Sequence, residues 1–196
     1  MITHLLVAGV RGGVGTTTLT ALIHALLTSQ GVRVQVADHS EGILGSRLSD
    51  EPGPGAEEQP TWTHTLSNAI QTVRLLDAGR YRPTFDELVA APSTGLILVG
   101  SGDTESIAAL NQISEPLAAQ DAARIGLCLV NVRRQRWPRA APAHTDTGLP
   151  ITRLPFETLL ATWGPVSAAE LAFVGRGTVA ALNTLLARLL TRGAAQ

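Results

Sequence analysis

The stretch VAGVRGGVGTTTLTAL, residues 7–22, joins a short apolar run to a glycine-rich turn and the first residues of a helical pattern. Gly12, Gly13 and Gly15 allow the backbone to pass close to an anion, so that successive N–H groups point inward at the start of a helix. Thr17 is placed to offer its hydroxyl to Mg²⁺. The stretch therefore predicts a phosphate-binding loop between a strand and a helix, with a plain glycine turn as the alternative.

Apolar runs and helical patterns alternate along the rest of the chain. The expected strands are residues 3–9, 32–38, 72–79, 95–100, 124–132 and 150–155, and the expected helices are residues 16–31, 106–120 and most of 166–192. Because strands joined through helices pair in parallel, we expect an α/β fold, a three-layer sandwich with a mostly parallel sheet. The length fits one domain over residues 1–196, in which the Pro-, Gly- and Glu-rich segment 40–62 is expected to be a flexible loop.

Residues that can carry chemistry gather where the expected strands end. Gly9, Asp38, Asp77 and Asn131 each lie at the carboxyl end of an expected strand. Ligands of parallel α/β sheets bind at that edge. The pattern therefore favours a binding site there, although a polar residue that simply ends a strand remains an alternative for each aspartate.

Composition excludes several classes of protein. Hydrophobic residues make up 44% of the chain and charged residues 16%, which favours a compact soluble protein over a disordered one. A net charge of −1 predicts no general attraction to nucleic acid or anionic lipid. The N-terminus carries no signal pattern, and no apolar stretch reaches the roughly 18 residues of a membrane span, so we expect a cytoplasmic protein. The single cysteine, Cys128, is expected in the core.

Residues 11–18, RGGVGTTT, resemble the deviant Walker A loop of the MinD/ParA family of P-loop ATPases, K-G-G-x-G-K-T-[ST]. Four other segments extend the resemblance. VRLLDAGR (73–80) looks like the Walker B strand of the family, VRVQVADHSEG (32–42) is similar to its strand that ends in D-x-D, and GLCLVNVRR (126–134) and ITRLPFET (151–158) are similar to the segments that hold adenine. Altered loops within the family are typical of TadZ/CpaE-type members.

The resemblance implies a P-loop NTPase architecture, bound ATP or ADP with Mg²⁺, and a nucleotide-dependent homodimer with a further protein partner. It assigns Arg11 and Asp38 to catalysis and Thr17 and Asp77 to the metal. The implied nucleotide-binding residues are Gly12, Gly13, Val14, Gly15, Thr16, Thr17, Thr18, Asn131 and Pro155.

Three positions depart from the family pattern. Arg11 replaces the signature lysine but keeps its charge, and the change is tolerable because all 15 basic residues of the chain are arginine. Thr16 replaces the lysine that contacts the β- and γ-phosphates, a loss of about 1.5–3 kcal/mol, or about 10- to 150-fold in affinity. Ser40 stands at the second aspartate of D-x-D. We therefore expect weak ATP binding with impaired or absent hydrolysis. The expected role of the protein is in the spatial positioning, partition or assembly of a cellular machine.

Other functions remain open at this point. An active partition-type ATPase would draw the missing charge from Arg11 or from an arginine of a partner. A scaffold would bind no nucleotide at all. A ligase or phosphotransferase on the same fold would need a catalytic lysine, and the chain contains none.

The segment NVRRQRWPR, residues 131–139, places Arg133, Arg134, Arg136 and Arg139 around Trp137. Such a patch is typical of binding to DNA phosphates or to an acidic protein, and a solvated loop is the alternative. The net charge of −1 weighs against nonspecific binding to DNA.

The last expected helix carries one apolar face. Membrane anchors of MinD relatives have this pattern. The closing helix of an α/β domain more often buries such a face in the core, and we therefore predict that this face packs in the core. The face consists of Val179, Leu182, Leu185, Leu186, Leu189 and Leu190.

Overall fold

The structure is a computed structural model, which describes residues 2–40, 44–48, 72–132, 142–157 and 164–192. The arginine-rich patch around Trp137 lies outside the described residues, and so does most of segment 40–62. Within that segment, residues 44–47 form a short 3₁₀ helix, η1 (Leu44–Arg47), whose Leu44 is fully buried.

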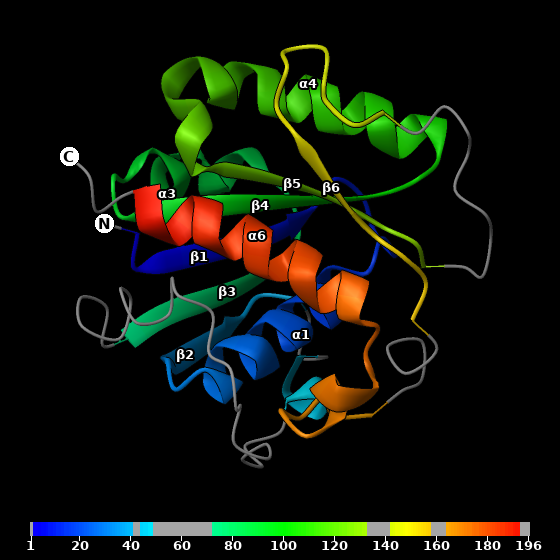
Figure 1. The fold of residues 1–196 in the computed structure, drawn as a ribbon. Helices are drawn as coiled ribbons and strands as arrows, with labels where there is room; N and C mark the ends of the chain where they lie inside the picture. The colour runs from blue at the N-terminus through cyan, green and yellow to red at the C-terminus, as the bar shows by residue number, and fades with distance from the viewer. Residues whose placement is uncertain (1, 41–43, 49–71, 133–141, 158–163, 193–196) are drawn as a thin grey trace.

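The described strands form one six-stranded sheet in which every pairing is parallel (Figure 1). Its order is β2-β3-β1-β4-β5-β6, so β1 and β4 lie at the centre. The eight residues of β4 are all buried, whereas β2, at an edge, is largely exposed on both faces. The strands are β1 (His4–Gly9), β2 (Arg33–Asp38), β3 (Thr72–Arg80), β4 (Thr94–Ser101), β5 (Ile125–Val130) and β6 (Ile151–Leu154).

Helices cover both faces of the sheet, which confirms the expected α/β sandwich (Figure 1). Side chains of a strand point alternately to its two faces, and β1 shows the consequence directly. Leu5 and Val7 pack into the core under α1 (Thr16–Ser29) and α6 (Arg176–Arg192), whereas Leu6 and Ala8 pack into a second core under α3 (Asp86–Ala90) and α4 (Thr104–Asp121). Cys128 is fully buried in the first of these cores, as predicted.

The chain before the last helix differs from the expected structure. Helix α6 begins only at Arg176, and residues 166–175 contain a short 3₁₀ helix, η4 (Glu170–Phe173). Ser167 and Glu170 exchange hydrogen bonds: the Ser167 N–H donates to Oε2 of Glu170 at 2.7 Å, and the Glu170 N–H donates to Oγ of Ser167 at 3.2 Å. This capping arrangement starts a helical turn, but the chain becomes extended at Val174, which ends it.

The apolar face of α6 is part of the core, as the sequence predicts. Leu182, Leu186, Leu189 and Leu190 are fully buried, and Val179 packs against them partly exposed. No helix within the described ranges is long and apolar enough to cross a bilayer.

Replacing Leu186 by alanine tests the role of this face. Because Leu186 is 0% exposed, we expect Leu186→Ala to lower the free energy of unfolding by about 2–5 kcal/mol. Phe173→Ala is the matched control: Phe173 is 79% exposed, and its loss should change stability by less than about 0.5 kcal/mol. Urea denaturation of the two variants measures the difference. Equal stability of both would contradict burial of the face.

Candidate functional site

The glycine loop between β1 and α1 packs tightly on the end of the strand. A Cβ atom at Gly9 would lie 2.5 Å from Oγ1 of Thr16 and 2.9 Å from the carbonyl oxygen of Arg11, so no side chain fits there. Gly13 and Gly15 have φ angles of 74° and 90°, a region that glycine adopts without strain. The loop therefore folds back directly onto β1 and starts α1 at its edge.

The first turn of α1 can accept a negatively charged ligand. Its N-cap residue, Gly15, provides no side-chain hydrogen bond, and no acidic residue occupies the first turn. The first N–H groups of an α-helix lack partners within the helix and attract anions. The start of α1 is therefore open to a phosphate group.

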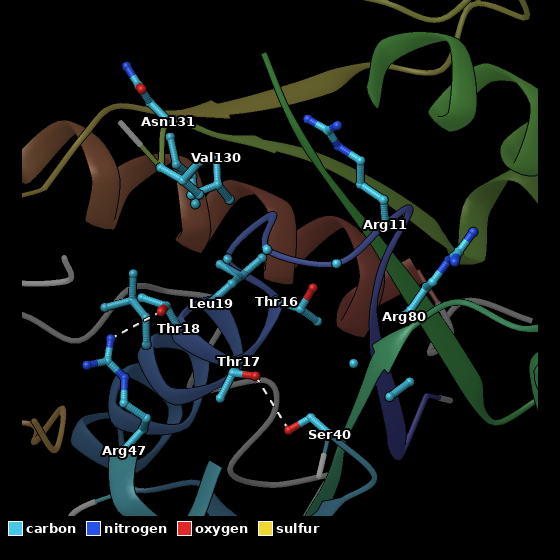
Figure 2. Close-up of a pocket in the computed structure, with 18 of the residues that line it drawn as sticks. Arg11, Thr16, Thr17, Thr18, Leu19, Ser40, Arg47, Arg80, Val130 and Asn131 are labelled. Atoms are coloured by element: carbon cyan, nitrogen blue, oxygen red, sulfur yellow. Dashed lines mark hydrogen bonds between the residues drawn. The ribbon is translucent and has the colours of Figure 1, made fainter. Parts of the chain in front are cut away.

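The loop forms one wall of a cavity of about 540 Å³, a size typical of small-molecule sites (Figure 2). The ends of β2 and β3 form a second wall, and the segments that follow β5 and β6 form a third. The residues proposed from sequence that line the cavity are Arg11, Gly12, Gly13, Gly15, Thr16, Thr17, Thr18, Asn131 and Pro155. Val14, Asp38 and Asp77 are not part of the lining, and Val14 is only 1% exposed, in the core.

Thr16 has little freedom in this structure. The residue is only 7% exposed, and its hydroxyl lies above Gly9. Its backbone carbonyl accepts a hydrogen bond from Thr20 Oγ1 at 3.0 Å. Thr16 thus fills space between the loop and the sheet and brings no charge to the cavity.

Four polar side chains meet beneath the loop, where β2 and β3 run side by side and Asp38 pairs with Asp77. Oγ1 of Thr17 lies 3.5 Å from Oγ of Ser40 (Figure 2). The same Ser40 hydroxyl donates to Oδ1 of Asp38 at 2.6 Å. Asp38 also accepts from the backbone N–H groups of Ser40 at 2.7 Å and Leu44 at 3.0 Å. Both oxygens of Asp38 are therefore engaged in holding the turn after β2.

Asp77 has one oxygen without a partner. The residue is 0% exposed, and one carboxylate oxygen, Oδ1, accepts from the Gly79 N–H at 2.9 Å. Oδ2 is buried and accepts no hydrogen bond from the described residues. Burial raises the pKa of Asp77 and the charge of Asp38 adds to this, while the Gly79 N–H and the hydroxyls of Thr17 and Ser40 act in the opposite direction.

These groups fit a Mg²⁺ ion that completes its coordination with phosphate oxygens and water. Mg²⁺ is usually held in proteins by one or two carboxylates and keeps several waters, and Asp77 and Thr17 offer oxygen atoms of the right kind. In the described ranges, no three His, Cys, Asp or Glu side chains are grouped to hold a metal by themselves.

Arg11 is bound to the start of α4. Its guanidinium lies 2.6 Å from Oδ2 of Asp103 and 3.1 Å from Oε2 of Glu105, and it also donates to the hydroxyls of Ser106 and Ser101. Asp103 caps α4 by accepting from the Ser106 N–H at 2.9 Å. Partial burial raises the pKa of Asp103, but its hydrogen bonds and the charge of Arg11 outweigh this and hold the pKa below its usual value.

Three further arginines line the cavity that the sequence did not single out: Arg47, Arg80 and Arg82. Arg47 comes from η1, is 5% exposed, and donates to Oγ1 of Thr18 and to the Gly164 carbonyl, both at 3.1 Å. Burial lowers the pKa of Arg47, and the charge of Glu170 partly offsets this. No motif in the sequence identifies these arginines.

The far end of the cavity is built from the ends of β5 and β6. The Asn131 N–H donates to the Leu154 carbonyl at 3.0 Å, which fixes Asn131 beside Pro155. Glu157 also lines the cavity, and it accepts hydrogen bonds from the Gly175 N–H at 3.2 Å and from Oγ1 of Thr178.

A six-stranded parallel sheet with a glycine loop between its first strand and first helix is an arrangement found in nucleotide-binding α/β folds, among which are the P-loop proteins. Within this class the chain has the fold of ParA- and MinD-type ATPases. It matches a ParA family ATPase from Chlorobium tepidum with a TM-score of 0.59 at 15% identity, over 95% of this chain and 99% of that one. Two further solved structures are also similar to this chain.

A plasmid partition protein from Borrelia burgdorferi matches with a TM-score of 0.52 at 11% identity, over 97% of this chain and 99% of that one. The MinC:MinD cell division protein complex of Aquifex aeolicus matches with a TM-score of 0.51 at 18% identity, over 98% and 96%. No protein-family model and no curated protein sequence matches the chain.

Asp77 and Asp38 should respond to pH in opposite directions. Because the pKa of Asp77 is raised on folding, its carboxyl lowers the free energy of unfolding as the pH rises above the unfolded pKa. In Mg²⁺-free buffer, Asp77→Asn should therefore melt at a higher temperature than the wild type at neutral pH, and the gain should disappear in acid.

Asp38→Asn is the matched control. Partial burial raises the pKa of Asp38, but hydrogen bonds from Ser40 and Leu44 outweigh this effect, and the net result is a lowered pKa. This carboxylate therefore stabilises the fold at pH values above its unfolded pKa. Asp38→Asn should be less stable than the wild type at neutral pH, with a deficit that shrinks in acid. Melting curves between acidic and neutral pH measure both, and shifts of the same sign would contradict this electrostatic account.

Proposed function

We propose that this protein binds ATP with Mg²⁺ weakly and hydrolyses it slowly or not at all. The observation that carries the proposal is the cavity itself: it extends from the uncapped start of α1 to Asn131 and Pro155. A triphosphate at the glycine loop would place a purine base against the far end. Mg²⁺ would lie at Thr17, with the free oxygen of Asp77 beside it.

Two features support slow or absent hydrolysis. Thr16 fills the space above Gly9 without a charge, so one phosphate contact is missing from a reaction that depends on positioning and charge stabilisation. Both oxygens of Asp38 accept hydrogen bonds from the turn after β2, and Ser40 stands next in that turn. Asp38, the described carboxylate of this turn, is therefore held by hydrogen bonds to the turn rather than free to orient an attacking water.

The fold supports a role in spatial positioning, partition or assembly. Similar solved structures include a plasmid partition protein and a cell division protein complex. By the same likeness we propose that the chain forms a nucleotide-dependent homodimer that acts on a protein partner. Light scattering of the purified protein with and without Mg²⁺-ATP tests the dimer.

Thr16→Lys tests the phosphate end of the site. Restoring one charge-assisted contact should tighten Mg²⁺-ATP binding by about 10- to 150-fold in titration calorimetry. Thr16→Gln, which adds length without charge, is the matched control and should give no such gain. If the wild type and Thr16→Lys both fail to bind ATP, the proposed function is wrong. Binding only by Thr16→Lys would indicate a scaffold with a vestigial site.

Arg11→Gln tests the alternative of an active ATPase that uses Arg11. Because the guanidinium of Arg11 already binds Asp103 and Glu105, we expect its removal to change ATP affinity little. A large loss of ATP affinity, or a wild-type phosphate-release rate that falls in the variant, would favour the active enzyme instead.

A further inference from the structure

The phosphate end of the cavity lacks a cation at position 16, where the related loops carry a lysine. Thr16 is uncharged and buried, and the chain has no lysine, so we look for the replacement among the arginines. Among the described residues, four arginines line the cavity: Arg11, Arg47, Arg80 and Arg82. Which of them is free to meet a ligand depends on the partners that each already has.

Two of the four are occupied. Arg11 forms ion pairs with Asp103 and Glu105 and two hydrogen bonds to hydroxyl groups at the start of α4. Arg47 is buried and donates to Thr18 and to the Gly164 carbonyl, on the other side of the start of α1 from Arg80 (Figure 2). Moving either guanidinium to a phosphate would break these contacts.

Arg80 is exposed, and its side chain forms no ion pair or hydrogen bond with the residues that the structure describes. It is the last residue of β3 and lies directly beside Gly9, the last residue of β1, because the register pairs the two. The pairing shifts by one residue between Val7 and Gly9, a bulge that puts Arg80 rather than Gly79 at that place.

The backbone around Arg80 is held on both sides. The Gly79 N–H donates to Asp77 at 2.9 Å, and the Tyr81 N–H donates to the Gly9 carbonyl at 2.8 Å. The backbone therefore holds Arg80 in a fixed position beside Gly9, with its side chain exposed. Figure 2 shows it on the same side of the loop as Arg11.

We propose that Arg80 is the cation that contacts the terminal phosphates of a nucleoside triphosphate in this cavity, in place of the missing loop lysine. The proposal rests on the function proposed above. An arginine can bind two phosphate oxygens at once through its planar fork, and it stays charged at every physiological pH. Arg82 also lines the cavity, but it belongs to the connection between β3 and the 3₁₀ helix at Pro83–Phe85, beyond the paired residues.

The first test compares three arginine variants for binding of Mg²⁺-ATP, Mg²⁺-ADP and AMP by titration calorimetry. Arg80→Gln should lose about 10- to 150-fold in affinity for ATP and much less for AMP, because the lost contact is with the terminal phosphates. The matched control is Arg74→Gln, because Arg74 is an exposed arginine of β3 outside the cavity lining, and this variant should bind ATP like the wild type. Arg82→Gln tests the other exposed arginine of the lining, and a larger loss of ATP affinity in Arg82→Gln than in Arg80→Gln would overturn the assignment. Melting curves check that all variants fold.

The second test uses the stronger binding expected of Thr16→Lys. If Arg80 substitutes for the loop lysine, the two cations act on the same phosphates, so Arg80→Gln should cost less affinity in the Thr16→Lys protein than in the wild type. An equal loss in both proteins would show that Arg80 acts elsewhere and would overturn the proposal.

The remaining outcomes separate this proposal from the one on which it rests. If the wild type binds ATP and Arg80→Gln binds it equally well, the assignment of Arg80 is wrong while the proposed function stands. If neither the wild type nor Thr16→Lys binds any of the three nucleotides, both proposals fail together.

Discussion

Gly9 has no space for a side chain, because Thr16 and the Arg11 carbonyl already lie within 3 Å of where its Cβ would be. This close approach turns the chain at the end of β1 and brings the start of α1 directly above the sheet edge. The parallel sheet adds the remaining walls, since the ends of β2, β3, β5 and β6 meet along the same edge. The cavity is therefore a consequence of one backbone contact combined with one sheet topology.

The same packing changes where positive charge is available. A threonine at position 16 fits under the loop, and the Thr16 side chain is nearly fully buried there. The cations of the cavity are consequently arginines at other positions, and whether each can meet a ligand depends on its neighbours. The acidic start of α4 holds Arg11, a buried environment holds Arg47, and only the end of β3 leaves an arginine without a described partner beside Gly9.

The fold was predictable because its signals are local. Buried strands such as β4 are continuous apolar runs, and the glycines at 13 and 15 occupy φ angles that only glycine adopts without strain. The sequence did not locate the start of α6 within the segment 166–192, which was expected to be mostly helical. A capping arrangement at Ser167 and Glu170 resembles a helix start in sequence, yet the chain leaves the helical region after one turn. Residues 83–90, which form η2 (Pro83–Phe85) and α3, gave no periodic signal because both elements are short.

By itself, the sequence determined the order of strands and helices, the position of the phosphate loop, and the loss of charge at Thr16, because these depend on residue type and on near neighbours in the chain. The tertiary structure decided which charged groups are free. Arg11 meets Asp103 across 92 residues, and a register shift between β1 and β3 places Arg80 opposite Gly9. Such pairings depend on how strands far apart in sequence are placed side by side, and no local pattern of residues encodes that placement.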